Sequence, residues 1–186
     1  MIRSAQMSDS REAAQLLAVI VRDMGLPFVE KLTEEELLAL IEEAYLAEDN
    51  RFSLANVRLL ELDGRVAGIA LVYPGSEAAR LDRHLSELIA ARYPGEEVVF
   101  DREAEEDELY IDSLCVFPQF RGQGVGTRLL EAVIAEAGAA GWSKLSLNVE
   151  QFNVNARRLY ERMGFSVTGQ FVIANHDYFH MTLSSS

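Results

Sequence analysis

The chain has 186 residues, enough for one domain with a sizeable core, and its 49% hydrophobic content argues against intrinsic disorder. Its formal net charge of −13 argues against nucleic acid as a partner, because phosphate backbones are bound by basic surfaces, and mildly favours cationic substrates. No apolar run approaches the roughly 20 residues that a membrane span needs, and the N-terminus has no signal-peptide pattern, so we expect a cytoplasmic protein without a membrane partner.

Apolar periodicity and cap residues predict the elements of the N-terminal half. Thr33, followed by three glutamates, predicts a capped helix with an acidic first turn. Asp63 and Gly64 stand between two β-rich runs, which predicts a hairpin. The expected elements are a short edge strand at 2–5, helices at 11–24 and 34–48, a hairpin within 57–75 and a helix at 76–93.

Strands alternate with helices in the C-terminal half. The expected elements are a strand at 108–117, a helix at 125–137, a strand at 144–149, a helix at 153–163 and strands at 165–171 and 176–183. The acidic run at 101–108, DREAEEDE, is expected to be a solvated loop. The order of elements predicts one α/β domain with a mixed sheet.

A glycine-rich turn, RGQGVGT at 121–127, comes directly before one of the expected helices. Glycines let a backbone approach a ligand closely, and the first amides of a helix are unpaired, so the turn predicts a site for a phosphate-bearing anion. The dinucleotide fingerprint does not fit, because the third glycine comes one residue early. The phosphate loop of nucleotide triphosphatases does not fit either, because no lysine follows Gly126. A diphosphate cradle of another kind, supported by Arg121, remains, and so does a plain strand-to-helix turn without a ligand.

Several motifs in the segment 110–165 together resemble the GCN5-related N-acetyltransferases (GNAT), a superfamily that transfers acetyl from acetyl-CoA to amines. They are Leu114-Cys115-Val116, Arg121-x-x-Gly124-x-Gly126, Asn153-x-x-Ala156-x-x-Leu159-Tyr160 and Gly164-Phe165. The match covers under a third of the chain. The resemblance implies one domain over 1–186 with the GNAT fold, a mixed and mostly antiparallel central sheet flanked by helices.

The resemblance also implies how acetyl-CoA binds as a co-substrate. In this family the pantetheine arm pairs with the backbone of the strand before the glycine turn, and the diphosphate lies on the turn itself. The implied cofactor-binding residues are Leu114, Cys115, Val116, Arg121, Gly122, Gln123, Gly124, Val125, Gly126, Thr127, Asn153, Ala156 and Tyr160.

Two catalytic roles follow from the same resemblance. The backbone amide of Leu114 would stabilise the charge that develops on the carbonyl oxygen. Tyr160 would donate a proton to the leaving thiolate, and helical spacing places it on one face with Asn153, Ala156 and Arg157. An amphipathic tyrosine with a buried ring is the structural alternative for Tyr160.

The general base is the least determined residue of the expected site. Alternation along the strand predicts that Glu108, Tyr110, Asp112, Leu114 and Val116 share one face. Asp112 and Glu108 are therefore the candidates, acting directly or through water. Membership of the solvated acidic run is the alternative for Glu108.

The remaining reactive side chains give no metal or thiol site. Cys115, the only cysteine, lacks a basic neighbour in the sequence and is expected to be a buried core residue. His84, His176 and His180 show no metal-ligand spacing, and His180 is expected to be an ordinary strand histidine.

The stretch 76–107 is longer than is typical of the family and is expected to be a helical insertion. It could shape the acceptor pocket or a contact between two copies of the chain. The expected reaction is transfer of acetyl to a primary amine by direct attack in a ternary complex. A small molecule is expected as the acceptor rather than a protein. The alternatives are another acyl-CoA, a protein amino terminus as acceptor, or a non-catalytic CoA-binding module.

Overall fold

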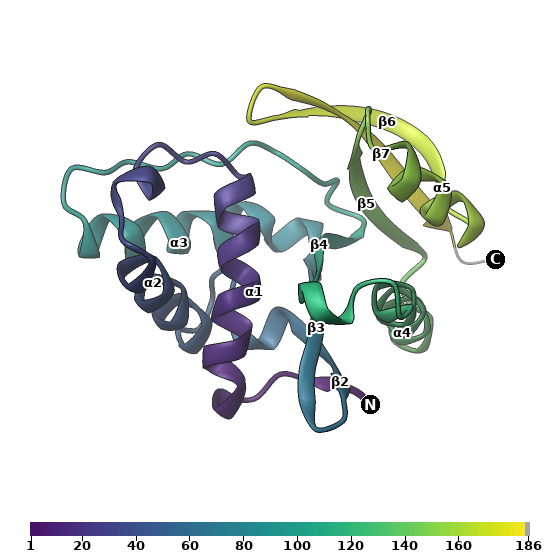
Figure 1. The fold of residues 1–186 in the computed structure, drawn as a ribbon. Helices are drawn as coiled ribbons and strands as arrows, with labels where there is room; N and C mark the ends of the chain where they lie inside the picture. The colour runs from purple at the N-terminus through teal and green to yellow at the C-terminus, as the bar shows by residue number, and fades with distance from the viewer. Residues whose placement is uncertain (185–186) are drawn as a thin grey trace.

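The computed structural model describes residues 1–184. Its seven strands form one sheet in the order β1-β2-β3-β4-β5-β7-β6 (Figure 1). The pair β4 and β5 is parallel and the other neighbouring pairs are antiparallel. The strands are β1 Ile2–Ser4, β2 Val57–Leu62, β3 Arg65–Pro74, β4 Leu109–Val116, β5 Lys144–Glu150, β6 Ser166–Ile173 and β7 His176–Ser184. This is the mixed, mostly antiparallel α/β sheet that the sequence predicted.

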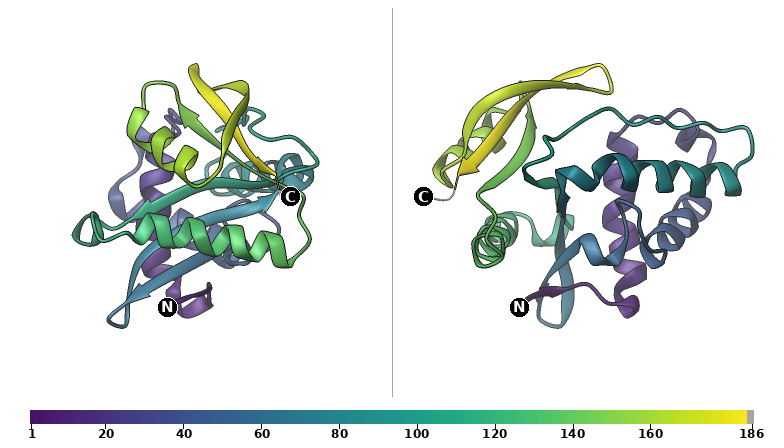
Figure 2. Two further views of the ribbon diagram at one scale, coloured as in Figure 1. Left: turned by 90° about the vertical axis from the view of Figure 1, so that its right-hand side faces the viewer. Right: turned by 180° about the vertical axis from the view of Figure 1, so that it is seen from behind.

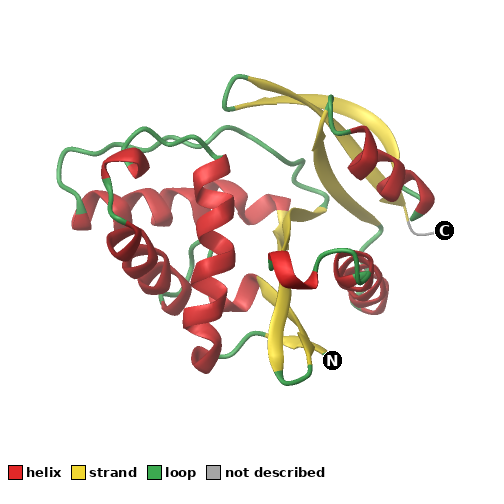
Figure 3. Cartoon of the chain, viewed as in Figure 1, coloured by secondary structure: helices red, strands yellow, loops and turns green. Residues whose placement is uncertain are grey.

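Helices cover both faces of the sheet (Figures 2 and 3). They are α1 Ser10–Asp23, α2 Glu34–Leu46, α3 Ala78–Arg92, α4 Val125–Ala139 and α5 Val154–Arg162. The buried side chains of α1, α2 and α3 form one core with the sheet, and those of α4 form a second core on the other face. No helix within residues 1–184 has the length and apolar character needed to cross a membrane.

The local signals of the sequence correspond to real caps and turns. Thr33 accepts a hydrogen bond from the Glu36 amide, and the Glu36 carboxylate accepts one from the Thr33 amide, which is a complete capping box. The helix it starts ends at Leu46, two residues before the expected Glu48. Asp63 and Gly64 have φ of 50° and 71°, the left-handed pair of a tight hairpin turn between β2 and β3.

A β-bulge in β4 overturns one expectation about side-chain direction. Leu71 of β3 pairs with Ser113, but the next residue of β3 pairs with Ile111, so Asp112 is an extra residue on β4. The bulge reverses the alternation beyond it. Tyr110 therefore packs with the α1–α3 core, whereas Leu114 and Val116 pack on the α4 side. The prediction that all five alternate residues of this strand share one face was wrong.

The acidic segment at 101–108 is also different from the expected solvated loop. Its side chains differ in exposure: Glu103 is largely covered and Ala104 and Glu108 are buried, whereas the other side chains are exposed. The segment is fixed at its end, where the Gly75 amide donates to the Glu108 carbonyl at 2.8 Å. A Cβ at Gly75 would lie 1.9 Å from the Glu105 carbonyl oxygen, so this close approach requires glycine.

Candidate active site

The two central strands β4 and β5 separate partway along their length. Their parallel pairing runs from Leu109 opposite Leu145 to Ile111 opposite Leu147 and then stops. Beyond that point β4 continues to pair with β3, and β5 continues to pair with β7, which turns away from the rest of the sheet (Figure 1). Within the described chain, the β4 edge from Ser113 to Val116 therefore has no strand beside it. Such an edge presents backbone donors and acceptors to an extended ligand.

The glycine turn lies at the end of this open edge. Gly122 and Gly124 have φ of 75° and 73°, which only glycine adopts without strain, and Gly124 is the N-cap of α4. No side chain among residues 1–184 caps the helix, and a Cβ on Gly122, Gly124 or Gly126 would meet no described atom within 4 Å. The first amides of α4 thus face open space at the positive end of a helix of 15 residues, a suitable site for a diphosphate.

A hollow of about 490 Å³ lies along the open strand on the α1 side. It is lined by Val19, Ile20 and Asp23 of α1, by residues 113–116 and by Arg121. Arg121 donates from Nε to the Val116 carbonyl at 3.3 Å, which ties its guanidinium to the end of the strand. Cys115 faces the α1–α3 core and is buried, as expected, and burial raises the pKa of its thiol.

Tyr160 lies on α5, which packs against the α4 side of the sheet. Its ring contacts Phe165 edge to face, with 6.3 Å between centroids, and Ala156 packs against the same core. Burial raises the pKa of the Tyr160 phenol, so the hydroxyl keeps its proton beyond the usual pH range. The structure thus leaves Tyr160 as a protonated hydroxyl on a half-buried ring.

Asn153 has a structural role that the expected site did not include. Its side-chain oxygen accepts a hydrogen bond from the Ala156 amide at 3.1 Å, so it is the N-cap of α5 rather than its first turn. Its amide nitrogen is left for other contacts. Arg157, the next residue on the predicted face, pairs with Glu161 and stacks on Phe179 of β7.

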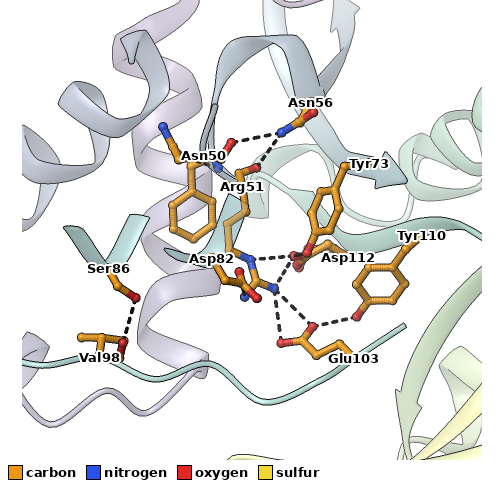
Figure 4. Close-up of polar contacts among 12 residues, drawn as sticks. Asn50, Arg51, Asn56, Tyr73, Asp82, Ser86, Val98, Glu103, Tyr110 and Asp112 are labelled. Atoms are coloured by element: carbon orange, nitrogen blue, oxygen red, sulfur yellow. Dashed lines mark hydrogen bonds and ion pairs between the residues drawn. The ribbon is translucent and has the colours of Figure 1, made fainter. Parts of the chain in front are cut away.

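A buried charge cluster surrounds Arg51 at the base of the open strand (Figure 4). Arg51 is 1% exposed and lies against three carboxylates, those of Asp82, Glu103 and Asp112. Burial opposes its charge, yet Asp112, Glu103 and Asp82 hold the pKa of Arg51 well above its usual range. Burial also raises the pKa of Asp82 to about 6 and raises that of Glu103, with Arg51 opposing both shifts. The single positive charge of Arg51 therefore lies against three carboxylates and cannot neutralise all of them.

Both predicted general bases are engaged in hydrogen bonds. Oδ2 of Asp112 accepts from Arg51 Nε at 3.0 Å and from the Tyr73 hydroxyl at 2.6 Å, and Oδ1 accepts from the Ser113 hydroxyl at 2.7 Å. Glu108 is 1% exposed, and its oxygens lie 3.0 and 3.1 Å from Nε2 of His180. Their catalytic roles stay predictions.

His180 and Asn148 connect this region to β5 and β7. Nδ1 of His180 lies 2.7 Å from the Asn148 side-chain oxygen, and the Asn148 amide donates to the Glu103 carbonyl at 2.7 Å and to the Tyr110 hydroxyl at 3.1 Å. His180 is thus a buried, hydrogen-bonded residue rather than an ordinary strand histidine. Groups of three or more side chains suited to a metal do not occur among residues 1–184.

Sequence reasoning missed Arg51, Glu103 and Asn148. Each stands in a segment without a motif, and the contacts that join Arg51 to Asp112, Arg51 to Glu103 and Asn148 to Glu103 span 61, 52 and 45 positions of the chain. The one local signal is an arginine in an otherwise apolar and small turn, NRFSLAN, which is unusual for a residue that is seldom buried without a partner.

Comparison with known proteins agrees with this geometry. The sequence model of the acetyltransferase (GNAT) family matches residues 17–165. The uncharacterized N-acetyltransferase YhfO of Bacillus subtilis (strain 168) is 36% identical over 108 residues, 53% of this chain and 72% of that protein. Two other relatives share shorter segments. The ribosomal protein bS18 alanine N-acetyltransferase of Haemophilus ducreyi is 42% identical over 32% of this chain and 41% of its own length. The peptidyl-lysine N-acetyltransferase YjaB of Salmonella typhimurium is 38% identical over 33% of this chain and 39% of its own length.

Solved structures match nearly the whole chain. A crystal structure of an acetyltransferase superposes with a TM-score of 0.89 at 35% identity, covering 99% of this chain and 98% of that one. An N-acetyltransferase from Staphylococcus aureus Mu50 gives a TM-score of 0.88 at 28% identity, covering 98% and 100%. The fold is also shared with yncA from Salmonella typhimurium, solved with its cofactor acetyl-CoA, at a TM-score of 0.61 and 22% identity, covering 99% and 92%.

Proposed function

Because the chain belongs to the acetyltransferase (GNAT) family and is an N-acetyltransferase, we propose that it moves acetyl from acetyl-CoA to a primary amine by direct attack in a ternary complex. The observation that carries this proposal is the open edge of β4 from Ser113 to Val116, which ends at the glycine turn before α4. An extended ligand with a diphosphate at one end fits such a strand and helix terminus.

The residues of the glycine turn and of the open β4 edge are suited to the two ends of acetyl-CoA. The first amides of α4, at 125–127, and Arg121 would hold the diphosphate, since no side chain of the described residues fills the turn. The backbone of Leu114 and Val116 would pair with the pantetheine arm. The relative solved with acetyl-CoA supports the choice of this co-substrate. Acetyl-CoA supplies the acetyl group as an activated thioester.

Two groups of the chain act on the reacting atoms in this proposal. The Leu114 amide donates to the carbonyl oxygen as it gains negative charge. The Tyr160 hydroxyl, whose pKa burial raises, gives its proton to the thiolate sulfur. Asn153, Ala156 and Tyr160 would contact the cofactor from α5, with Asn153 using its amide nitrogen because its oxygen caps the helix.

The test is a product assay with acetyl-CoA and a panel of acceptors, followed by mass spectrometry. The panel contains small primary amines, lysine peptides and peptides with a free alanine amino terminus, because relatives act on peptidyl-lysine and on the alanine of a ribosomal protein. We expect acetylated small amines. Acetylation of peptides alone would assign a protein acceptor, and binding of acetyl-CoA without any product would overturn the proposed activity.

A further inference from the structure

Glu103 lies at the point where β4 and β5 begin to separate. The last parallel pair is Ile111 with Leu147, and the next residue of β5, Asn148, donates from its side chain to the Glu103 carbonyl at 2.7 Å. On the β4 side, the Tyr110 hydroxyl donates to Oε2 of Glu103 at 2.8 Å. Glu103 is thus held between the two strands, by its backbone carbonyl on the β5 side and by its carboxylate on the β4 side, on the face opposite α4.

The segment that carries Glu103 is fixed at several points. The Ser86 hydroxyl of α3 donates to the Val98 carbonyl at 2.7 Å, as Figure 4 shows, and the Ala174 amide of the β6–β7 turn donates to Asp101 at 2.9 Å. The Glu105 amide donates to Glu108 at 3.1 Å. These contacts to α3, the β6–β7 turn and the residue before β4 give Glu103 a defined position.

Solvent reaches Glu103 through a cavity of about 670 Å³ between α3 and the 98–106 segment. Its charged lining residues are the acids Asp82, Asp101, Glu103 and Glu106 and the two arginines Arg83 and Arg102. The volume suits a small molecule. The surplus of carboxylates around Arg51 gives the inner wall negative charge, which favours a cation such as an ammonium.

We propose that Glu103 is the catalytic base that takes the proton of the acceptor amine, and that the amine enters through the cavity between α3 and the 98–106 segment. This inference rests on the acetyl transfer proposed above. Glu103 has free acceptor capacity, because its Oε1 receives only Arg51 Nη2, at 3.3 Å, among the described residues. Asp112, by contrast, uses both oxygens for Arg51, Tyr73 and Ser113.

The surroundings of Glu103 make it a suitable base. Burial raises its pKa, and the neighbouring Asp112 adds to the shift while Arg51, Tyr110 and their hydrogen bonds oppose it. A carboxylate whose pKa moves toward neutrality is a better proton acceptor at physiological pH. Glu108 lies instead directly before β4, next to the first parallel pair at Leu109 and against His180.

Charged and titratable groups face Glu103 from each element packed against it. They are Arg51 from the turn after α2, Tyr73 of β3, Asp82 and Arg83 of α3, Tyr110 and Asp112 of β4, Tyr178 of β7, and Asp101, Arg102 and Glu106 of its own segment. The pKa of Tyr178 is raised by burial and by the carboxylates of Glu150, Glu103 and Asp23, which places negative charge from three segments around one region.

The proton balance of the step is complete without another reactant. The incoming ammonium gives one proton to Glu103, which releases it to solvent through the cavity. The neutral nitrogen then attacks the thioester carbon, the C–N bond forms and the C–S bond breaks. The second proton of the nitrogen replaces the one that Tyr160 donates to the thiolate, so the products are the amide, the CoA thiol and one proton.

Glu103→Gln tests the proposal against the matched control Glu97→Gln, which removes an exposed carboxylate of the same segment that does not line the cavity. We expect Glu103→Gln to lower kcat/KM for amines about 100-fold, the usual size of a lost general base. Acetyl-CoA affinity measured by calorimetry should be unchanged, and Glu97→Gln should behave as the wild type. The rate of Glu103→Gln should rise with pH toward the pKa of the amine, because a deprotonated amine needs no base.

Glu103→Asp keeps the carboxylate and guards against a folding defect. It should retain the acidic limb of the wild-type pH profile with an intermediate rate. A wild-type rate and pH profile in Glu103→Gln would overturn the assignment of Glu103 while leaving the acetyltransferase activity standing. An equal loss of kcat/KM in Glu103→Gln and Glu103→Asp that is the same at every pH would overturn it as well. Failure of the wild type to acetylate any amine while it binds acetyl-CoA would overturn the proposed function and this inference with it.

Discussion

The guanidinium of Arg51 donates from Nε to Oδ2 of Asp112 at 3.0 Å, which joins the turn after α2 to the bulge of β4. Asp112 is the residue that shifts the register of β4 just before its open edge begins. Tyr73 of β3 donates to the same oxygen at 2.6 Å. The conformation of the open strand therefore depends on a charge that comes from a different part of the fold.

Removal of the Arg51 charge should destabilise the protein strongly. Arg51→Met leaves the carboxylates of Asp82, Glu103 and Asp112 without a cation, and breaking a buried pair in this way costs about 3–5 kcal/mol. Urea unfolding at pH 7 measures the loss. The matched control is Arg58→Met, since Arg58 pairs with a half-exposed Glu136, and it should cost about 1 kcal/mol or less. Equal losses in the two variants would contradict a special role of the buried cluster.

Gly124→Val should weaken acetyl-CoA binding. The position has φ of 73°, where a β-branched residue is strained, and its side chain would enter the space before the first amides of α4. Gly141→Val is a matched control, because Gly141 follows the other end of α4 with φ of 79° and equally open surroundings. Both variants should lose about 1–2 kcal/mol of stability, but calorimetry should show reduced affinity for acetyl-CoA in Gly124→Val alone. Equal affinity in both would remove the turn from the binding site.

The sequence allowed prediction of those features that depend on neighbouring residues. The Thr33 cap, the Asp63-Gly64 turn and the glycine turn before α4 are each determined by a few consecutive side chains. The bulge at Asp112 left no such signal, because it depends on pairing with β3. Glu103 and Asp112 lie 52 and 61 residues from Arg51, so the burial of Glu103 and the engagement of Asp112 could not be read from local patterns.

Tyr160→Phe should lower turnover about 10- to 100-fold while acetyl-CoA binding stays within twofold, since the ring keeps its contact with Phe165 and only the proton donor is lost. Because burial raises the pKa of the phenol, the wild-type donor should stay active as pH rises beyond the usual tyrosine range. Steady-state rates at saturating amine measure the effect. Tyr45→Phe is the control, a tyrosine that donates to the Gln6 carbonyl far from the site. Unchanged kcat in Tyr160→Phe would exclude Tyr160 as the acid.

Stability should depend on pH through Asp82. Its folded pKa is about 6 against an ordinary 3.8, so between pH 4 and 6 the folded state binds more protons than the unfolded state. The free energy of unfolding contributed by this group therefore falls as pH rises through that window, by roughly 3 kcal/mol at 1.36 kcal/mol per pKa unit. Asp82→Asn should reduce this slope in urea titrations, and Glu103, whose pKa burial also raises, contributes to the slope that remains.

Asp9 gives a comparison of opposite sign. Its hydrogen bonds with Arg3 lower its pKa, so it contributes stability above the ordinary value that is lost as pH falls through its folded pKa. Asp9→Asn should therefore change the profile below about pH 4 and leave the window of Asp82 unchanged. A slope between pH 4 and 6 that is as steep in Asp82→Asn as in the wild type would contradict the shifted carboxyl of Asp82.

Amine capture should depend on charge and on salt. The chain carries a net charge of −13, and carboxylates of Asp82, Glu103 and Glu106 line the cavity through which we propose that the amine enters. A negative field concentrates an ammonium near the site and weakens as the screening length falls from about 10 Å at 0.1 M salt to about 3 Å at 1 M. We expect kcat/KM for a cationic amine to fall about tenfold over this range, the lower end of electrostatic steering. For an amine of similar size that is neutral at the assay pH, kcat/KM should change by less than about twofold, because a neutral molecule is not attracted by this field.

Acetyl-CoA is kept saturating at each salt concentration, so that the salt dependence of its own binding does not enter the comparison. Capture by charge would be refuted by an equal salt dependence of kcat/KM for the two amines, or by a higher kcat/KM for the neutral amine at low salt. Neither result would count against the acetyl transfer itself.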